Sequence, residues 1–134
     1  HSRSGLFMSS DPVETWKDPI MVCEGPSDTA CMMDAGFTAI GRPSCNGGID
    51  LLLPLLRGRE VVIVSDGDSP GRKGADRLAG LLGASRSVKI IEPPCNDVRE
   101  WLTDMGSSDA VHFLVQAAKE LRVNAKTQVQ RQCA

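Results

Sequence analysis

Three acidic residues come just after apolar segments of the chain, where strands of a sheet would end. Glu24 follows residues 19–23, and Asp66 and Asp68 follow residues 61–64. Residues two apart in an extended chain point to the same side, so the two aspartates can aim at one point. Carboxylates crowded together repel one another unless some are protonated or a cation lies between them. A hard divalent ion such as Mg²⁺ (or Mn²⁺) prefers such oxygen ligands and also binds phosphate oxygens, so the pattern indicates metal-dependent phosphate chemistry.

The elements that must position these acids follow from the hydrophobic pattern. Short, continuous apolar runs predict buried strands, whereas segments between them repeat apolar residues with helical spacing. Strands that alternate with helices predict an α/β fold, with a mainly parallel sheet of about four strands and helices on both faces. Ligands of such folds bind at the carboxyl ends of the strands, which is where the acids lie. The predicted strands are residues 19–23, 37–40, 61–64 and 88–91, and the predicted helices begin near Ser27, Asp50, Ser69, Asp97 and Ser108.

Capping residues mark the limits of the two helices that follow the acids. Ser27 is the expected N-cap of the first helix and Gly36 its stop, because glycine readily ends a helix in the left-handed conformation. Ser69 and Pro70 have the types favoured for an N-cap and a first helical position. Both helices should therefore begin within a few residues of the acids.

Each acid also has a structural interpretation. A strand-end aspartate such as Asp66 often serves only as a helix cap or a turn residue. Asp28 lies in the first turn of its predicted helix, where the helix dipole stabilises a carboxylate, so structural and supporting roles are both open for it. Asp97 and Glu100 have the spacing of a capping box, which by itself favours a structural role for Asp97. The convergence of Glu24 with two aspartates is what favours a metal.

A basic segment, Gly71-Arg72-Lys73-Gly74, follows the acidic pair. Two glycines in the first turns of a helix lower its stability, which would make sense if a phosphate or a nucleic-acid backbone passed close by. Arg72 and Lys73 could then contact that phosphate. The alternative is a solvated basic turn. The spacing of a P-loop is absent, so this is not a Walker-type nucleotide site.

The composition places the chain in the ordinary globular class. Its 134 residues suit one domain, and its apolar runs are far shorter than a membrane span, so no membrane contact is expected. Five cysteines without a C-x-x-C pair argue against a disulfide scaffold or a zinc site and indicate a reducing, cytoplasmic location. With a net charge of −2, any contact with nucleic acid would rely on local basic patches. Because the chain starts with His1 rather than Met, we expect it to be a piece of a longer protein.

Two motifs together resemble the Toprim family: E-G-P-S-D at residues 24–28 and V-V-I-V-S-D-G-D-S-P-G-R-K-G-A-D-R-L at residues 61–78. That family includes DnaG-type primases, topoisomerases, some nucleases and recombination mediators. Its hallmark is a glutamate after the first strand and D-x-D after a later one. The chain is most similar to DnaG-type and phage-like primases, over residues 19–104. The resemblance implies a compact Toprim (Rossmann-like) domain at residues 19–121, between a lead-in at 1–18 and a polar tail at 122–134.

The resemblance also implies roles for the residues that match the family motifs. Asp66 and Asp68 match the metal-binding pair, and Glu24 matches the glutamate that binds metal or acts as general acid/base. Asp97 matches the first acid of a primase D-P-D element, which implies a metal role. The second acid of that element is Arg99 here, so the number of bound metal ions stays open. The supporting positions are Asp28, Gly25 and Gly67, and the phosphate or nucleic-acid candidates are Gly71, Arg72, Lys73 and Gly74.

The activity that the resemblance implies is primer synthesis. A primase joins nucleoside triphosphates into a short RNA primer on single-stranded DNA by Mg²⁺-dependent nucleotidyl transfer, and other domains would contact a replicative helicase. Two alternatives within the family are a nuclease that cuts phosphodiesters with the same acids and a non-catalytic binding module similar to recombination mediators. A haloacid-dehalogenase-type phosphatase also uses D-x-D, but it expects Thr or Val where this chain has Pro70.

Overall fold

The computed structural model describes residues 6–43, 48–93 and 108–118. Within them, five strands form one sheet: β1 (Phe7–Met8), β2 (Ile20–Glu24), β3 (Thr38–Arg42), β4 (Glu60–Val64) and β5 (Ser87–Ile91). Their order in the sheet is β1-β3-β2-β4-β5. The last four strands of the chain run parallel to one another, and the edge strand β1 is antiparallel to β3. The predicted α/β class and mainly parallel sheet are therefore confirmed, with β1 as an additional strand.

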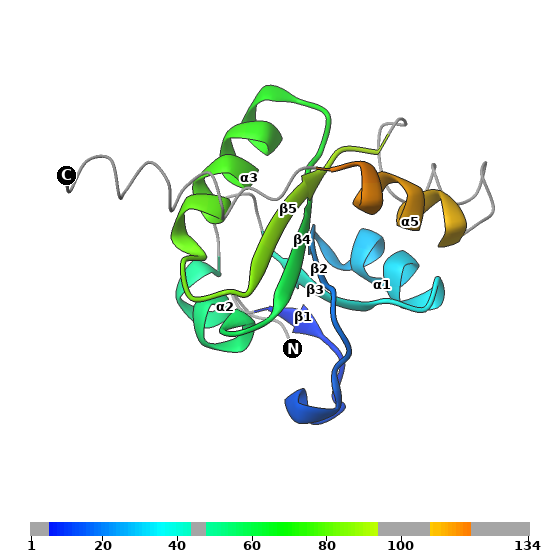
Figure 1. Ribbon diagram of the computed structural model, residues 1–134, viewed down its shortest axis with the longest axis vertical. Helices are drawn as coiled ribbons and strands as arrows, with labels where there is room; N and C mark the ends of the chain where they lie inside the picture. Colours follow the sequence, from blue (N-terminus) through cyan, green and yellow to red (C-terminus); the bar gives the residue numbers. More distant parts are fainter. Residues whose placement is uncertain (1–5, 44–47, 94–107, 119–134) are drawn as a thin grey trace.

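Helices cover both faces of the sheet, as Figure 1 shows. They are α1 (Pro26–Asp34), α2 (Ile49–Leu56), α3 (Ser69–Leu81) and α5 (Ser108–Ala117), and a short 3-10 turn, η1, spans Val13–Thr15. α1 and α5 lie on one face, and α2 and α3 lie on the other. None of the helices in the described ranges is long and apolar enough to cross a membrane.

β2 is the central strand and is buried on both faces, which explains its continuous apolar run. Ile20 and Val22 join the core on the side of α2 and α3, whereas Met21 and Cys23 join the core on the side of α1. All four side chains are at most 2% exposed. Burying an aliphatic side chain of this size stabilises the fold by about 1.5–3 kcal/mol. Polarity begins at Glu24, where the strand reaches the carboxyl edge of the sheet.

The two helices that follow the acids begin earlier than predicted. α1 starts directly after Gly25, whose φ of 77° suits glycine, so the expected cap Ser27 lies inside the helix. α3 has Asp68 as its N-cap, so the expected cap Ser69 is already helical. Both predicted caps are therefore wrong. In α1, Pro26 is the first helical residue, so the cap must precede it. In α3, the Asp68 side chain accepts the hydrogen bond of the Gly71 N–H and takes the capping position from Ser69.

The segment ahead of β2 packs into the fold although its sequence is poorly patterned. Leu6 and Trp16 are each 7% exposed and join the core on the side of α2 and α3. Arg59 holds this segment against the fold through hydrogen bonds. Its guanidinium donates hydrogen bonds to the backbone carbonyls of Trp16 at 2.8 Å and Val13 at 2.6 Å. The packed unit thus begins before residue 19, where the domain was expected to start.

The start of α1 lies very close to β3. Thr29, which is fully buried, donates a hydrogen bond to the carbonyl of Gly25 at 2.6 Å. The backbone N–H of Gly25 in turn donates to the carbonyl of Arg42 at 2.8 Å. A Cβ at Gly41 would lie 2.9 Å from the Gly25 oxygen and would overlap the Thr29 hydroxyl. Glycine is therefore required at position 41, and this contact holds the turn after Glu24 against the neighbouring strand.

Replacing Gly41 by alanine should lower the free energy of unfolding by about 1–3 kcal/mol, because the new methyl group meets backbone and buried side-chain atoms. The matched control is Gly80→Ala, inside α3, where a Cβ meets nothing within 4 Å. That change should raise stability by about 0.5–1 kcal/mol, since alanine favours a helix more than glycine does. Urea unfolding measures both effects, and equal midpoints for the two variants would contradict this packing.

Candidate functional site

The three predicted acids lie together at the carboxyl edge of the sheet. Glu24 is the last residue of β2, and Asp66 and Asp68 come just after β4. β2 and β4 are parallel neighbours, so their carboxyl ends meet (Figure 1). The side chains of Glu24 and Asp66 are joined by a hydrogen bond, and the charge of Asp68 also acts on Glu24. The structure thus brings together acids that are far apart in the sequence.

The surroundings of Glu24 raise its pKa from 4.5 to about 7. Partial burial is the largest cause, followed by the hydrogen bond with Asp66 and the negative charges of Asp66 and Asp68. A protonated Glu24 can donate that hydrogen bond, whereas an ionised Glu24 would place like charges together. Near neutral pH, Glu24 can therefore hold or release a proton, as a general acid or base must.

Arg42 also belongs to this edge, although it was not predicted from the sequence. Arg42 ends β3 and pairs with Glu24 in the strand register. It is only 4% exposed, and its positive charge lowers the pKa of Glu24, against the larger influences that raise it. An arginine this deeply buried supplies a fixed positive charge beside the acids. The sequence pattern placed it in a loop, because the strand was expected to end at Ile40.

Asp68 has the structural role that was considered for strand-end acids, because it caps α3. Its Oδ1 accepts a hydrogen bond from the backbone N–H of Gly71 at 2.7 Å. A Cβ on Gly71 would lie 2.8 Å from Asp68 Oδ1 and 2.9 Å from the backbone oxygen of Asp66. Glycine at position 71 is therefore explained without a nearby phosphate. It leaves room for α3 to begin directly against the turn that carries Asp66 and Asp68. The cap uses one oxygen of the Asp68 carboxylate and keeps its negative charge at the site.

The basic segment of α3 is tied to a further acid, Glu92, just after β5. Arg72 Nε donates to Glu92 Oε1 at 2.8 Å, and Arg72 Nη2 donates to Glu92 Oε2 at 3.1 Å. Glu92 lies beside the acidic turn, since a Cβ at Gly67 would be 3.9 Å from Glu92 Oε2. The hydrogen bonds lower the pKa of Glu92 and raise that of Arg72. Lys73 next to them is exposed, and Gly74 is buried.

The supporting residues Gly25 and Asp28 follow Glu24 closely, whereas the metal candidate Asp97 falls outside the described ranges. Gly25 forms the turn after β2, and Asp28 is half-buried in the first turn of α1. Burial is the main cause that raises the pKa of the Cys23 thiol, and the charge of Asp28 is the next. Asp97 and Arg99 lie outside the described residues, so the metal role expected for Asp97 stays a prediction.

The donor chemistry of this edge suits a hard divalent cation. Glu24, Asp66 and Asp68 offer carboxylate oxygens, the ligands that Mg²⁺ prefers. Burial is the largest cause that raises the pKa of Glu24, and the negative charges of Asp66 and Asp68 add to it; a cation would offset those charges. Among the described residues, no three acidic, histidine or cysteine side chains are arranged as a ligand cluster. Binding a metal would therefore draw these side chains towards a common point.

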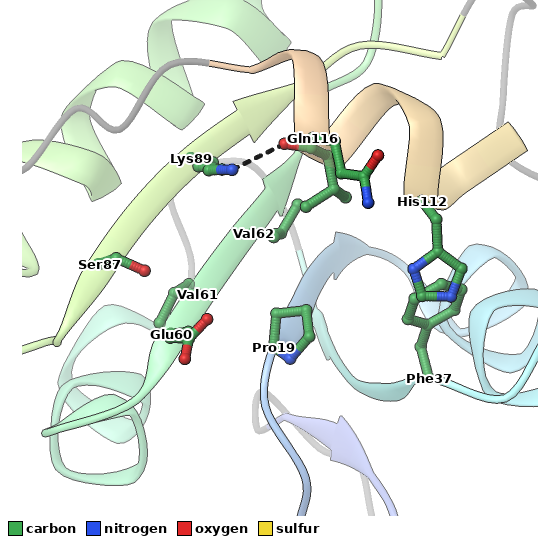
Figure 2. A pocket seen from close by; sticks show the side chains of 10 residues that line it. Pro19, Phe37, Glu60, Val61, Val62, Ser87, Lys89, His112 and Gln116 are labelled. Atoms are coloured by element: carbon green, nitrogen blue, oxygen red, sulfur yellow. Dashed lines mark hydrogen bonds between the residues drawn. The ribbon is translucent and has the colours of Figure 1, made fainter. Parts of the chain in front are cut away.

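A separate pocket lies at the other end of the sheet (Figure 2). It is lined by α5 and by residues at the amino ends of β4 and β5. Lys89 donates a hydrogen bond to the carbonyl of Val115 at 2.9 Å across it, and the rings of Phe37 and His112 lie 4.8 Å apart at its side. The acids follow the carboxyl ends of the strands, so this pocket does not include them.

The fold matches those of primase catalytic cores. No protein-family model and no curated protein matches the chain. Among solved structures, the DnaG catalytic core has a TM-score of 0.63 and 19% identity, over 81% of this chain and 37% of that chain. The primase fragment of the bacteriophage T7 primase-helicase protein has a TM-score of 0.56 and 20% identity, over 72% of this chain and 43% of that chain. The DnaG primase catalytic domain bound to ssDNA has a TM-score of 0.60 and 20% identity, over 84% of this chain and 38% of that chain.

These similarities confirm the fold that the Toprim resemblance implied. At 19–20% identity they show the fold alone and leave the chemistry to the residues of this chain. The chain spans only 37–43% of the length of these three structures.

The raised pKa of Glu24 makes stability depend on pH. Between pH 4.5 and about 7, the folded state keeps a proton on Glu24 that the unfolded state has released. This contribution to stability is complete below pH 4.5 and is lost as the pH rises through about 7. Glu24→Gln removes the titrating group, so the variant should gain stability relative to the wild type as the pH rises from about 5 to about 8.

Urea unfolding at several pH values checks this expectation. The control is Glu14→Gln, which removes an exposed acid from η1, and its stability curve should run parallel to that of the wild type. A difference between the wild type and Glu24→Gln that does not change with pH would show that folding does not raise the pKa of Glu24.

Proposed function

We propose that this chain is the Toprim catalytic domain of a DNA primase, which makes short RNA primers on single-stranded DNA. One observation carries the proposal: Glu24 and Asp66 are hydrogen-bonded across the ends of two parallel strands, with Asp68 beside them. Both acidic motifs of the Toprim resemblance therefore lie at one edge of the sheet. The fold that holds them matches the DnaG and phage T7 primase structures.

The proposed reaction is nucleotidyl transfer from a nucleoside triphosphate. Asp66 and Asp68, joined in this proposal by Asp97, would hold Mg²⁺ (or Mn²⁺) through carboxylate oxygens. When bound there, such an ion would supply positive charge for the triphosphate and the leaving pyrophosphate. Glu24, with a pKa of about 7, would accept the proton of the attacking 3′-hydroxyl or serve as a further ligand of the ion. Arg42 keeps Glu24 partly ionised for either task.

The remaining candidates would serve the phosphates and the template. Arg72 and Lys73 lie at the start of α3, beside the acids, where phosphate groups would approach. One of the matched structures is a DnaG domain bound to ssDNA, and this chain spans 38% of it. We therefore assign most of the binding of the single-stranded DNA template, and any contact with a replicative helicase, to other domains of a longer cytoplasmic protein. The net charge of −2 agrees with that division.

Binding of Mn²⁺ tests the metal part of the proposal. We expect the chain to bind Mn²⁺, and Asp66→Asn and Asp68→Asn each to weaken that binding by about tenfold or more. Asparagine is also a good N-cap, so Asp68→Asn should keep α3 folded. The matched control is Asp76→Asn, an exposed acid on the same helix, which should leave the affinity unchanged. Calorimetric titration measures the affinities, and equal values in all four proteins would exclude a metal site at these aspartates.

Primer synthesis tests the proposed activity. Because the chain spans 37% of the DnaG catalytic core that it matches, we expect these 134 residues alone to make little or no primer. In a longer protein that contains the chain, Asp66→Asn and Asp68→Asn should abolish primer synthesis. Metal-dependent cutting of nucleic acid without nucleotides would indicate the nuclease alternative instead. Full activity of the doubly substituted parent protein would indicate a non-catalytic binding module.

A further inference from the structure

Arg72 and Glu92 form an ion pair with two hydrogen bonds. It lies next to the acidic edge, the carboxyl edge of the sheet that carries Glu24, Asp66 and Asp68. Their side chains are 58% and 41% exposed. Exposed ion pairs contribute little to stability, so the fold does not depend on this one. Its position sets it apart, because Glu92 lies beside the acidic turn and Arg72 is also attracted by the charge of Asp68.

The contact that Arg72 makes with Glu92 has the geometry of a phosphate contact. The guanidinium is a planar fork whose parallel N–H groups match the oxygens of a carboxylate or a phosphate equally well. Two of its nitrogens already meet the two oxygens of Glu92, at 2.8 Å and 3.1 Å. Glu92 therefore fills the place on Arg72 that a phosphate group would take.

We propose that Glu92 is an internal competitor for a phosphate subsite at Arg72, and that Arg72 exchanges Glu92 for a phosphate of a bound oligophosphate. Before a ligand arrives, Glu92 holds the guanidinium through two hydrogen bonds. When a triphosphate or pyrophosphate binds at the acidic edge, its own charge replaces that of Glu92. The biological ligand rests on the proposed function, whereas the exchange itself needs only an oligophosphate.

The test is the affinity of the full 134-residue chain for inorganic tripolyphosphate, measured by calorimetry in the presence of EDTA. Glu92→Gln should bind tripolyphosphate about fivefold more tightly than the wild type, because the competing charge is gone. Arg72→Gln should bind tripolyphosphate about fivefold more weakly, because the variant lacks the guanidinium. In the double variant, the effect of Glu92→Gln should disappear, since Glu92 acts only through Arg72.

A second exposed ion pair provides a matched control. Arg86 Nη1 and Glu60 Oε2 lie 3.7 Å apart, and the side chains are 69% and 43% exposed. This pair lies at the amino ends of β4 and β5, away from the acids. Glu60→Gln and Arg86→Gln change the net charge as the test variants do, and both should leave the affinity for tripolyphosphate unchanged.

The competing explanations give different results. If Glu92→Gln leaves the affinity unchanged, or if neither that variant nor the wild type binds tripolyphosphate, the exchange is refuted. If Glu92→Gln weakens the binding of Mn²⁺ and does not tighten the binding of tripolyphosphate in EDTA, then Glu92 is a metal ligand rather than a competitor, and the proposal is again refuted. If Mn²⁺ does not bind but Glu92→Gln still tightens tripolyphosphate binding, the exchange stands and the metal-dependent function fails.

Discussion

The contact between Glu24 and Asp66 places two acids where they would repel each other if both were ionised. A hydrogen bond between two carboxyl groups needs a proton, and burial, the hydrogen bond with Asp66 and the nearby negative charges together raise the pKa of Glu24 to about 7. The two acids start close to each other because β2 and β4 are parallel neighbours, paired up to Val22 and Ile63. A divalent cation could replace the proton, and the proposed chemistry depends on that replacement.

Backbone packing, more than the side chains themselves, holds the acids close together. Gly41 lets the start of α1 approach β3, and Gly71 lets α3 begin against the turn that carries Asp66 and Asp68. Both contacts bring a helix N-terminus to the same edge, where the helix dipole favours negative charge. The contacts that stabilise the edge of the fold are thus the contacts that position the acids.

Two arginines balance this negative charge in different ways. Arg42 is buried at the end of β3 and supplies a permanent positive charge beside Glu24. Arg72 is exposed on α3 and paired with Glu92, and we have proposed that it exchanges this partner for a phosphate. A fixed and an exchangeable cation suit a reaction in which a highly charged triphosphate arrives and a charged pyrophosphate leaves. In the proposed reaction, the charge of Arg42 would lower the pKa of Glu24, and Arg72 would respond to the ligand.

The sequence by itself determined the α/β class, the strands at 19–23 and 61–64 and the acids at their ends, because apolar runs and motif spacing are local properties of the chain. It did not show that the strands carrying Glu24 and Asp66 are neighbours, which follows only from the order of the strands in the sheet. The roles of Arg42 and Glu92 were missed for the same reason, since each acts on a residue from another element. Strand pairing sets contacts between residues far apart in the chain, and no local pattern encodes it.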